Sequence, residues 1–167
     1  MKKYLFSLMI ALLASMSFAL TSCGDDDDEP NGNNGKVTVN YEESAVGTVT
    51  VEVIQSDYQQ ISSNRGNTTF SATLEDNGSY SYLQFTTVDK ANEISKGQTL
   101  SVHAINFTVG QTSAHYFTDD YSGKVTVADV QGDRITLSFA NFKFNRELDN
   151  GEEQAITING NISFSEQ

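Results

Sequence analysis

From Lys36 to the end of the chain, apolar and polar residues alternate, and this alternation constrains the fold more than any other feature of the sequence. Successive side chains of a strand point to opposite faces of a sheet, so alternation is typical of strands that bury one face. The first alternating runs place apolar residues at Val37, Val39 and Tyr41, at Val49, Val51 and Val53, and at Phe70, Ala72 and Leu74. The sequence therefore predicts an all-β domain over residues 36–167.

The later runs keep this pattern but change phase at two places. The run that starts at Leu100 changes phase before Ile105, which predicts a β-bulge near His103 or Ala104. A second change of phase lies beyond Ala140. The other apolar positions are, in chain order, Tyr80, Tyr82, Leu83, Phe85, Val125, Val127, Ile135, Leu137, Phe139, Phe142, Phe144, Ile156, Ile158, Ile162 and Phe164.

Turn residues separate these runs. Residues 75–78 end in an Asn-Gly pair, which tight hairpins favour, and residues 131–133 and 149–151 also contain glycine next to Asp or Asn. We count eight strands joined mostly by hairpins. The changes of phase favour a single antiparallel β-sandwich, because they indicate strands that bend between sheets. A closed, calycin-like β-barrel is the alternative.

The first 22 residues have the layout of a secretory signal peptide. Lys2 and Lys3 give a positive start, and the run from Leu5 to Leu20 is apolar apart from three serines. Small and polar residues follow at positions 21 and 22, directly before the single cysteine of the chain, Cys23. A positive start, a short apolar run and small residues at the cleavage point are the parts of a signal peptide. A permanent membrane helix would need a longer apolar run.

The residues Leu20-Thr21-Ser22-Cys23 resemble the lipobox of bacterial lipoproteins. The resemblance implies that the chain is cut before Cys23 and that this cysteine carries a diacylglyceryl group. Lipidation also explains why an exported protein has a lone cysteine, because the modification consumes the thiol. Two or more fatty chains hold a protein stably on a membrane, whereas one binds only marginally.

Residues 24–30, which read Gly-Asp-Asp-Asp-Asp-Glu-Pro, resemble the acidic tract that follows the lipidated cysteine in surface-exposed lipoproteins of Bacteroidetes. The resemblance implies an outer-membrane protein exposed at the cell surface. Residues 31–35 contain only Asn and Gly, so residues 23–35 are expected to form a lipidated, acidic and flexible tether. Residues 122–127, 135–139 and 156–160 are similar to parts of small, uncharacterised Bacteroidetes lipoprotein β domains, which implies no known activity.

The charge of the chain excludes some classes of partner. The formal net charge is −12 at pH 7, and the predicted signal peptide contains basic residues but no acidic ones, so the mature chain is more acidic still. Nucleic-acid binding needs clustered Lys and Arg, and so does docking on anionic lipid headgroups. We therefore expect no nucleic-acid partner, and contact with the membrane only through the lipid.

The sequence contains no recognisable catalytic motif. It has no G-x-S-x-G, no H-E-x-x-H, no phosphate-binding glycine loop and no paired-cysteine metal site. His103 is expected to be a structural residue on a strand, and His115 lies far from it in the sequence. The carboxylates at positions 147–153 surround a turn and are expected to be solvated. These observations predict a protein that is not an enzyme, with no catalytic residues, no metal and no cofactor besides the lipid on Cys23.

One loop combines aromatic, acidic and imidazole side chains between two predicted strands. Loops at the ends of a sandwich often carry recognition, and tyrosine offers a rigid contact face with a polar tip. The candidate ligand-binding residues are His115, Tyr116, Phe117, Asp119, Asp120 and Tyr121. Tyr80 and Tyr82 share a strand face and form either a second aromatic platform or part of the core.

The features together predict a membrane-anchored surface lipoprotein that acts as a non-catalytic binding module for a glycan or an extracellular protein. Two alternatives remain open at this point. One is a structural or assembly subunit of a cell-envelope complex, and the other is a small-ligand-binding β-barrel.

Overall fold

The strands occupy most of the chain that the structure describes. The structure is a computed structural model, and it describes residues 35–42, 44, 47–61, 67–109, 120–148 and 150–167. The strands are β1 (Lys36–Tyr41), β2 (Gly47–Ile61), β3 (Asn67–Asp76), β4 (Ser79–Thr87), β5 (Val102–Val109), β6 (Tyr121–Gln131), β7 (Arg134–Glu147) and β8 (Glu153–Glu166). A single short 3-10 helix, η1 (Ala91–Glu93), is the only helix among these residues.

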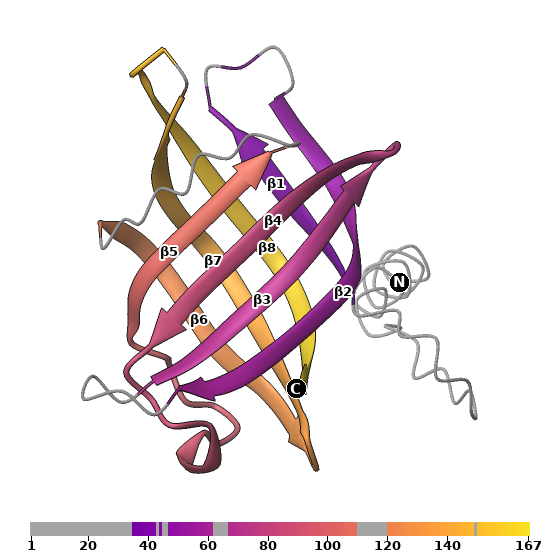
Figure 1. The fold of residues 1–167 in the computed structure, drawn as a ribbon, viewed down its shortest axis with the longest axis vertical. Helices are drawn as coiled ribbons and strands as arrows, with labels where there is room; N and C mark the ends of the chain where they lie inside the picture. Colours follow the sequence, from indigo (N-terminus) through magenta and orange to yellow (C-terminus); the bar gives the residue numbers. More distant parts are fainter. Residues whose placement is uncertain (1–34, 43, 45–46, 62–66, 110–119, 149) are drawn as a thin grey trace, which may run out of the picture. The chain divides into compact units, whose positions relative to one another are not determined.

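The strands form one sheet in the order β5-β4-β3-β2-β1-β8-β7-β6, and each neighbouring pair in that order is antiparallel. The sheet curls so that β3, β4 and β5 cross in front of β6, β7 and β8 (Figure 1). The predicted all-β class, the antiparallel pairing and the eight strands are confirmed. The arrangement is a half-barrel whose two halves pack face to face, so it combines the face-to-face packing of the predicted sandwich with the single sheet of the alternative.

Aromatic rings from both halves of the sheet fill the space between them. Phe70 and Phe85, on the neighbouring strands β3 and β4, stack with their ring centroids 5.1 Å apart. Phe85 meets Phe139 of β7 edge-on at 5.8 Å, and Phe70 meets Phe164 of β8 at 5.1 Å. Edge-on and offset-stacked pairs stabilise a core beyond the area they bury. The two halves are therefore held together by a shared core of large side chains.

Hydrogen bonds outside the named strands also join the two edges of the sheet. The segment that leads into β5 lies against β6, where Gly97 N donates to Val127 O at 2.7 Å and Leu100 N donates to Val125 O at 2.9 Å. Val127 N donates in turn to Gln98 O at 2.8 Å. These bonds hold the edge strands β5 and β6 together at one end and so stabilise the curled form of the sheet.

Both predicted changes of phase correspond to irregularities in strand pairing. Thr86 pairs with Ala104 and Thr87 pairs with Val102, so His103 is the extra residue of a bulge in β5, as predicted. The pairing of β7 with β8 also shifts between Phe139 and Phe142. Each bulge reverses which residues face the core, which explains why the apolar pattern changes phase there.

A third bulge, which the sequence pattern did not predict, lies in the long strand β2. The register with β3 shifts between Val53 and Gln55, so Ile54 is the extra residue, and it is 44% exposed. Before the bulge Val53 faces the core, whereas after it the buried residues are Ser56 and Tyr58. Gln55 and every second residue after it along β2 therefore point outward.

Strand β1 is short, and β2 and β8 meet directly beyond its end. There Asp57 pairs with Ser165 and Tyr58 with Glu166, in parallel orientation. The buried Ser56 hydroxyl donates to the Ser163 carbonyl oxygen at 2.6 Å. This contact brings the end of β8 against the outer half of β2.

Among the described residues, no helix has the length and apolar character that a membrane span requires.

Candidate functional site

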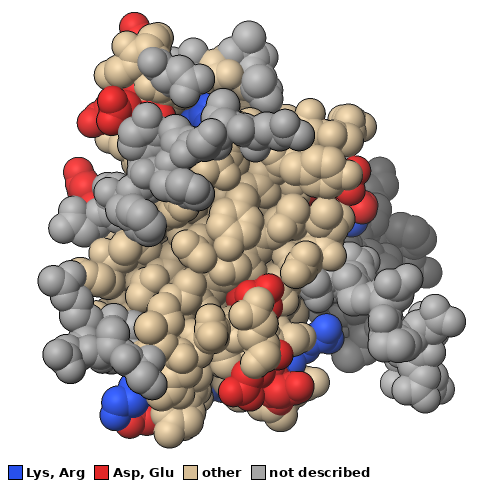
Figure 2. Space-filling model, in the orientation of Figure 1, with Lys and Arg blue, Asp and Glu red and all other residues tan. Residues whose placement is uncertain are grey.

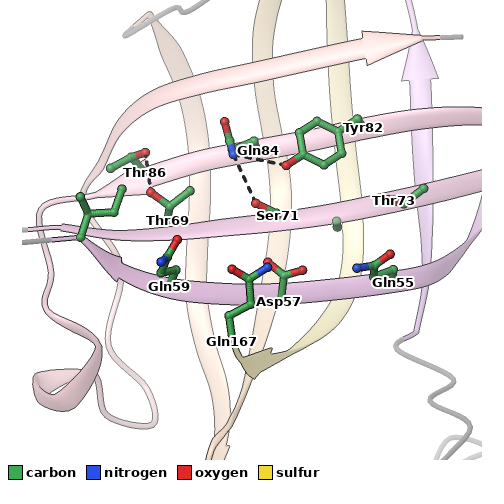
Figure 3. Close-up of a pocket in the computed structure, with 12 residues that line it drawn as sticks. Gln55, Asp57, Gln59, Thr69, Ser71, Thr73, Tyr82, Gln84, Thr86 and Gln167 are labelled. Carbon is green, nitrogen blue, oxygen red and sulfur yellow. Dashed lines mark hydrogen bonds between the residues drawn. The ribbon is translucent and has the colours of Figure 1, made fainter. Parts of the chain in front are cut away.

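The outer face of β2, β3 and β4 carries an ordered array of polar side chains. The outward residues of these strands lie directly opposite one another, which aligns them in three rungs across the sheet (Figure 3). The rungs are Gln59, Thr69 and Thr86; then Asp57, Ser71 and Gln84; then Gln55, Thr73 and Tyr82. Consecutive rungs are two residues apart along each strand, or about 6.6–6.8 Å.

The sizes of these side chains hollow the face into a groove. In these rungs the central strand β3 contributes only Thr and Ser, which form a low floor, and Ala72 of the same strand also lines the cavity. The flanking strands contribute mainly longer side chains, such as Gln55, Gln84 and Tyr82, which form the walls. The cavity between them has a volume of about 510 Å³, and Ile61 and Gln167 also line it. The groove therefore follows β3 and suits an extended ligand.

Gln84 organises the middle of the groove through its side-chain amide. Its Nε2 atom donates to Ser71 Oγ and to Tyr82 Oη, each at 3.3 Å. At the next rung the hydroxyls of Thr69 and Thr86 lie 3.2 Å apart and share a hydrogen bond. These bonds hold the floor and one wall in a fixed arrangement. The Gln84 side-chain oxygen accepts no hydrogen bond from the described residues, so it remains available as an acceptor.

The groove is nearly uncharged although the chain is strongly acidic. Among the described residues that line it, Asp57 is the one with a charged side chain, and none of them is Lys or Arg. Figure 2 shows that uncharged side chains dominate the visible face, while acidic side chains lie at several points along its margins and in its lower middle. On the inner side of β2, burial raises the pKa of the Tyr58 phenol, and the Glu166 and Asp133 carboxylates raise it further.

Most of the predicted recognition loop lies outside the described residues, as does Cys23, the predicted site of lipidation. This applies to His115, Tyr116, Phe117 and Asp119. Of the other two predicted residues, Asp120 is exposed directly before β6. Tyr121 is half-buried, with its ring 5.7 Å from the Phe142 ring, and lines a small cleft of about 200 Å³ beside Lys143. Tyr121 therefore covers the core at one edge of the sheet.

Tyr80 and Tyr82, which the sequence placed either on an aromatic platform or in the core, lie outside the core. Both lie on the outer face of β4, opposite Glu75 and Thr73 of β3. Tyr82 is half-buried in the groove wall, whereas Tyr80 is 49% exposed and does not line the groove. Of the two, only Tyr82 is thus part of a concave site.

The remaining candidates occupy the positions that the sequence indicated. His103 is exposed at its bulge, and Glu147, Glu152 and Glu153 are exposed around the β7–β8 hairpin, while Asp149 lies outside the described residues. Within the described ranges, no three His, Cys, Asp or Glu side chains come together as metal ligands.

The polar groove itself was missed by the sequence analysis. Its residues on β3 and β4 follow from the alternation, because Thr69, Ser71 and Thr73 are the polar positions between buried ones. The contribution of β2 was hidden by the bulge at Ile54. The signal was present, since Tyr58 lies an odd number of residues after Val53 and a regular strand would place the two on opposite faces.

We compared the chain with protein-family models, with curated proteins and with solved structures, and none of the three comparisons gave a match.

Proposed function

We propose that the protein is a non-catalytic binding module that holds an extended, polyhydroxylated ligand, a glycan chain, in the groove along β3. The observation that carries this proposal is the array of amide and hydroxyl side chains on β2, β3 and β4, arranged around a concave cleft of about 510 Å³.

The chemistry of the groove matches that of sugars better than that of other ligands. Side-chain amides and hydroxyls both donate and accept hydrogen bonds, as sugar hydroxyls do. Tyr82 adds an aromatic face with a hydroxyl at its edge, which suits the apolar side of a sugar ring. An anionic ligand is disfavoured, because no Lys or Arg is among the described lining residues.

The packing of the core favours a ligand on the wall of the domain over one inside it. The described inward residues of the two halves of the sheet contact one another directly, as Phe85 does with Phe139 and Phe142. A barrel that carries a small apolar molecule needs an open interior instead.

The proposed location follows from the N-terminal residues. We propose that a lipid on Cys23 anchors the protein in the outer membrane and that residues 23–35 hold the domain at the cell surface. A module tethered in this way would capture glycans close to the cell.

The groove is tested by filling its floor. Ser71 lies at the centre of the floor, and Ser138 is a matched control, because it also points outward from the middle of an inner strand of the sheet. We expect the native chain and Ser138→Tyr to bind the same members of a glycan array. Ser71→Tyr should lose this binding while both variants keep the circular dichroism spectrum of the native chain.

Two results would contradict the proposal. One is an array on which the native chain retains no glycan. The other is glycan binding that Ser71→Tyr retains in full, which would locate the ligand elsewhere on the molecule.

A further inference from the structure

Asp57 lies in the middle rung of the groove, and its carboxylate has no partner among the described residues. It is half-buried and stands opposite Ser71 in the strand pairing. No described residue gives its side chain a hydrogen bond or an ion pair, and Figure 3 shows it between Gln55 and Gln59 along β2. Other carboxylates of the chain have such partners, for example Asp129 with Lys96 and Glu42 with Lys143. Within the described part of the chain, the groove therefore presents an unmatched negative charge at its centre.

The fold directs this carboxylate into the groove. If β2 continued without a bulge, so that Ile54 were paired like its neighbours, the alternation from Val53 would place Asp57 on the core side of the sheet. Burial of an unpaired carboxylate in an apolar core is strongly unfavourable, so an aspartate at position 57 requires the bulge. The bulge thus fixes the carboxylate on the same face as the amides of the groove.

The neighbours of Asp57 define what it is able to bind. On its own strand it is flanked by Gln55 and Gln59, and across the floor it faces Ser71 and then Gln84. These groups satisfy neutral hydroxyls but do not neutralise a charge. A ligand with one positive group among many hydroxyls would match the whole arrangement, because hydrogen bonds between charged groups are shorter and stronger than neutral ones.

We propose that the groove prefers glycans that carry free amino groups, with the ammonium group of an amino sugar placed on the Asp57 carboxylate. This proposal rests on the proposed function and specifies its ligand class. Neutral glycans would bind through the amides and hydroxyls alone. Acidic glycans would be repelled by Asp57 and by the overall negative charge of the chain.

A pair of oligosaccharides that differ only at the nitrogen tests the preference. Calorimetric titration of the full chain is carried out with a β-1,4-linked glucosamine oligomer and with its fully N-acetylated counterpart of the same length. We expect the free amine to bind about tenfold more tightly, a difference equivalent to about 1.4 kcal/mol.

Two variants separate a specific contact from general attraction between opposite charges. Asp57→Asn keeps the shape of the side chain but removes its charge, and it should bring the two oligomers to equal affinity. Glu147→Gln removes one negative charge from an exposed position on β7, outside the groove, and it should retain the tenfold preference.

The outcomes distinguish this proposal from the one on which it rests. Equal binding of both oligomers by the native chain would overturn the preference and leave a general glycan site standing. Equal loss of preference in both variants would also overturn it, because the effect would then come from net charge. Absence of binding to either oligomer, and to every glycan of an array, would overturn both proposals.

Discussion

Tyr58 points into the core from the segment of β2 whose outward residues line the groove. Tyr58 is 5% exposed, and its ring lies 5.8 Å from the Phe70 ring, while the next residues on either side, Asp57 and Gln59, line the groove. Burial is the main reason that its pKa is raised above the ordinary value of 10.0, and the carboxylates of Glu166 and Asp133 contribute as well. The folded chain therefore favours the neutral phenol.

This raised pKa predicts a loss of stability at alkaline pH. Below pH 10 the phenol is neutral in both the folded and the unfolded chain, so it adds no pH dependence. Above pH 10 the unfolded chain releases the proton first, and the free energy of unfolding falls until the folded phenol also ionises. Urea unfolding from neutral to alkaline pH should show a steeper fall for the native chain than for Tyr58→Phe.

Tyr80→Phe is the control for this measurement, because Tyr80 is 49% exposed. It should follow the native pH profile. If Tyr58→Phe also followed it, burial would not be what holds the Tyr58 proton.

Single residues explain where the sequence was sufficient and where it was not. The Asn77-Gly78 turn was predictable, because both residues adopt positive φ angles, 48° and 81°, that few other residue types tolerate. The bulge at His103 was predictable from apolar residues on both sides of it. The bulge at Ile54 was missed, because the residues that follow it toward the core include Ser56, whose burial depends on a hydrogen bond to the distant Ser163.

At the level of elements, the bulge of β6 at Gly123 lies directly against the irregular backbone of β7 at Asn141. The pairing of these strands shifts between Ser122 and Lys124, where Gly123 has a φ of 83°. A β-carbon at Gly123 would overlap the carbonyl oxygen of Asn141, which itself has a φ of 48°. Position 123 therefore requires glycine for two reasons: its backbone has a positive φ, and the backbone of β7 leaves no room for a β-carbon.

Two glycine substitutions separate these reasons. Gly132 also has a positive φ, 60°, but a β-carbon there would meet no atom within 4 Å. We expect Gly132→Ala to cost about 1–2 kcal/mol of stability from backbone conformation alone. Gly123→Ala should cost this amount and about 1–3 kcal/mol more from overpacking. Urea denaturation midpoints of the two variants give the comparison, and equal midpoints would show that β6 and β7 do not approach closely at Gly123.

The strands themselves were predictable, but their order in the sheet was not. Hairpin turns fix which consecutive strands pair, as for β3 with β4 and β6 with β7. The placement of β1 between β2 and β8 joins segments that are far apart in the sequence. The hydrogen bonds that join Gln98 and Leu100 to β6 do the same. Local alternation contains no information on such pairings, which is why sandwich and barrel remained alternatives.

For the whole molecule, the proposed anchor makes a prediction independent of the groove. Replacement of Cys23 by Ala removes the thiol that would carry the lipid. We expect the native chain to incorporate a palmitate analogue and to sediment with membranes. The diacylglyceryl group proposed for Cys23 has two fatty chains, and two or more chains hold a protein stably on a membrane. The Cys23→Ala variant should lose both properties. A variant that stayed membrane-bound to the same extent would exclude the lipid as the anchor.

The candidate site depends on the whole fold more than on any motif. Short side chains on β3 between longer ones on β2 and β4 make a groove only because the strands are adjacent and in register. The sequence alone draws attention instead to residues that are close together in the chain, such as residues 115–121. Sites of this kind become visible only once strand pairing is known.

Mapping the bound ligand on the backbone shows whether it lies in the groove along β3. Amide resonances of an isotope-labelled chain are recorded during titration with a glycan that the chain retains. A ligand in the groove should shift mainly the amides of β2, β3 and β4 around Asp57, Ser71 and Gln84. Shifts confined to β6, β7 and β8, with the amides of the groove unchanged, would contradict this location.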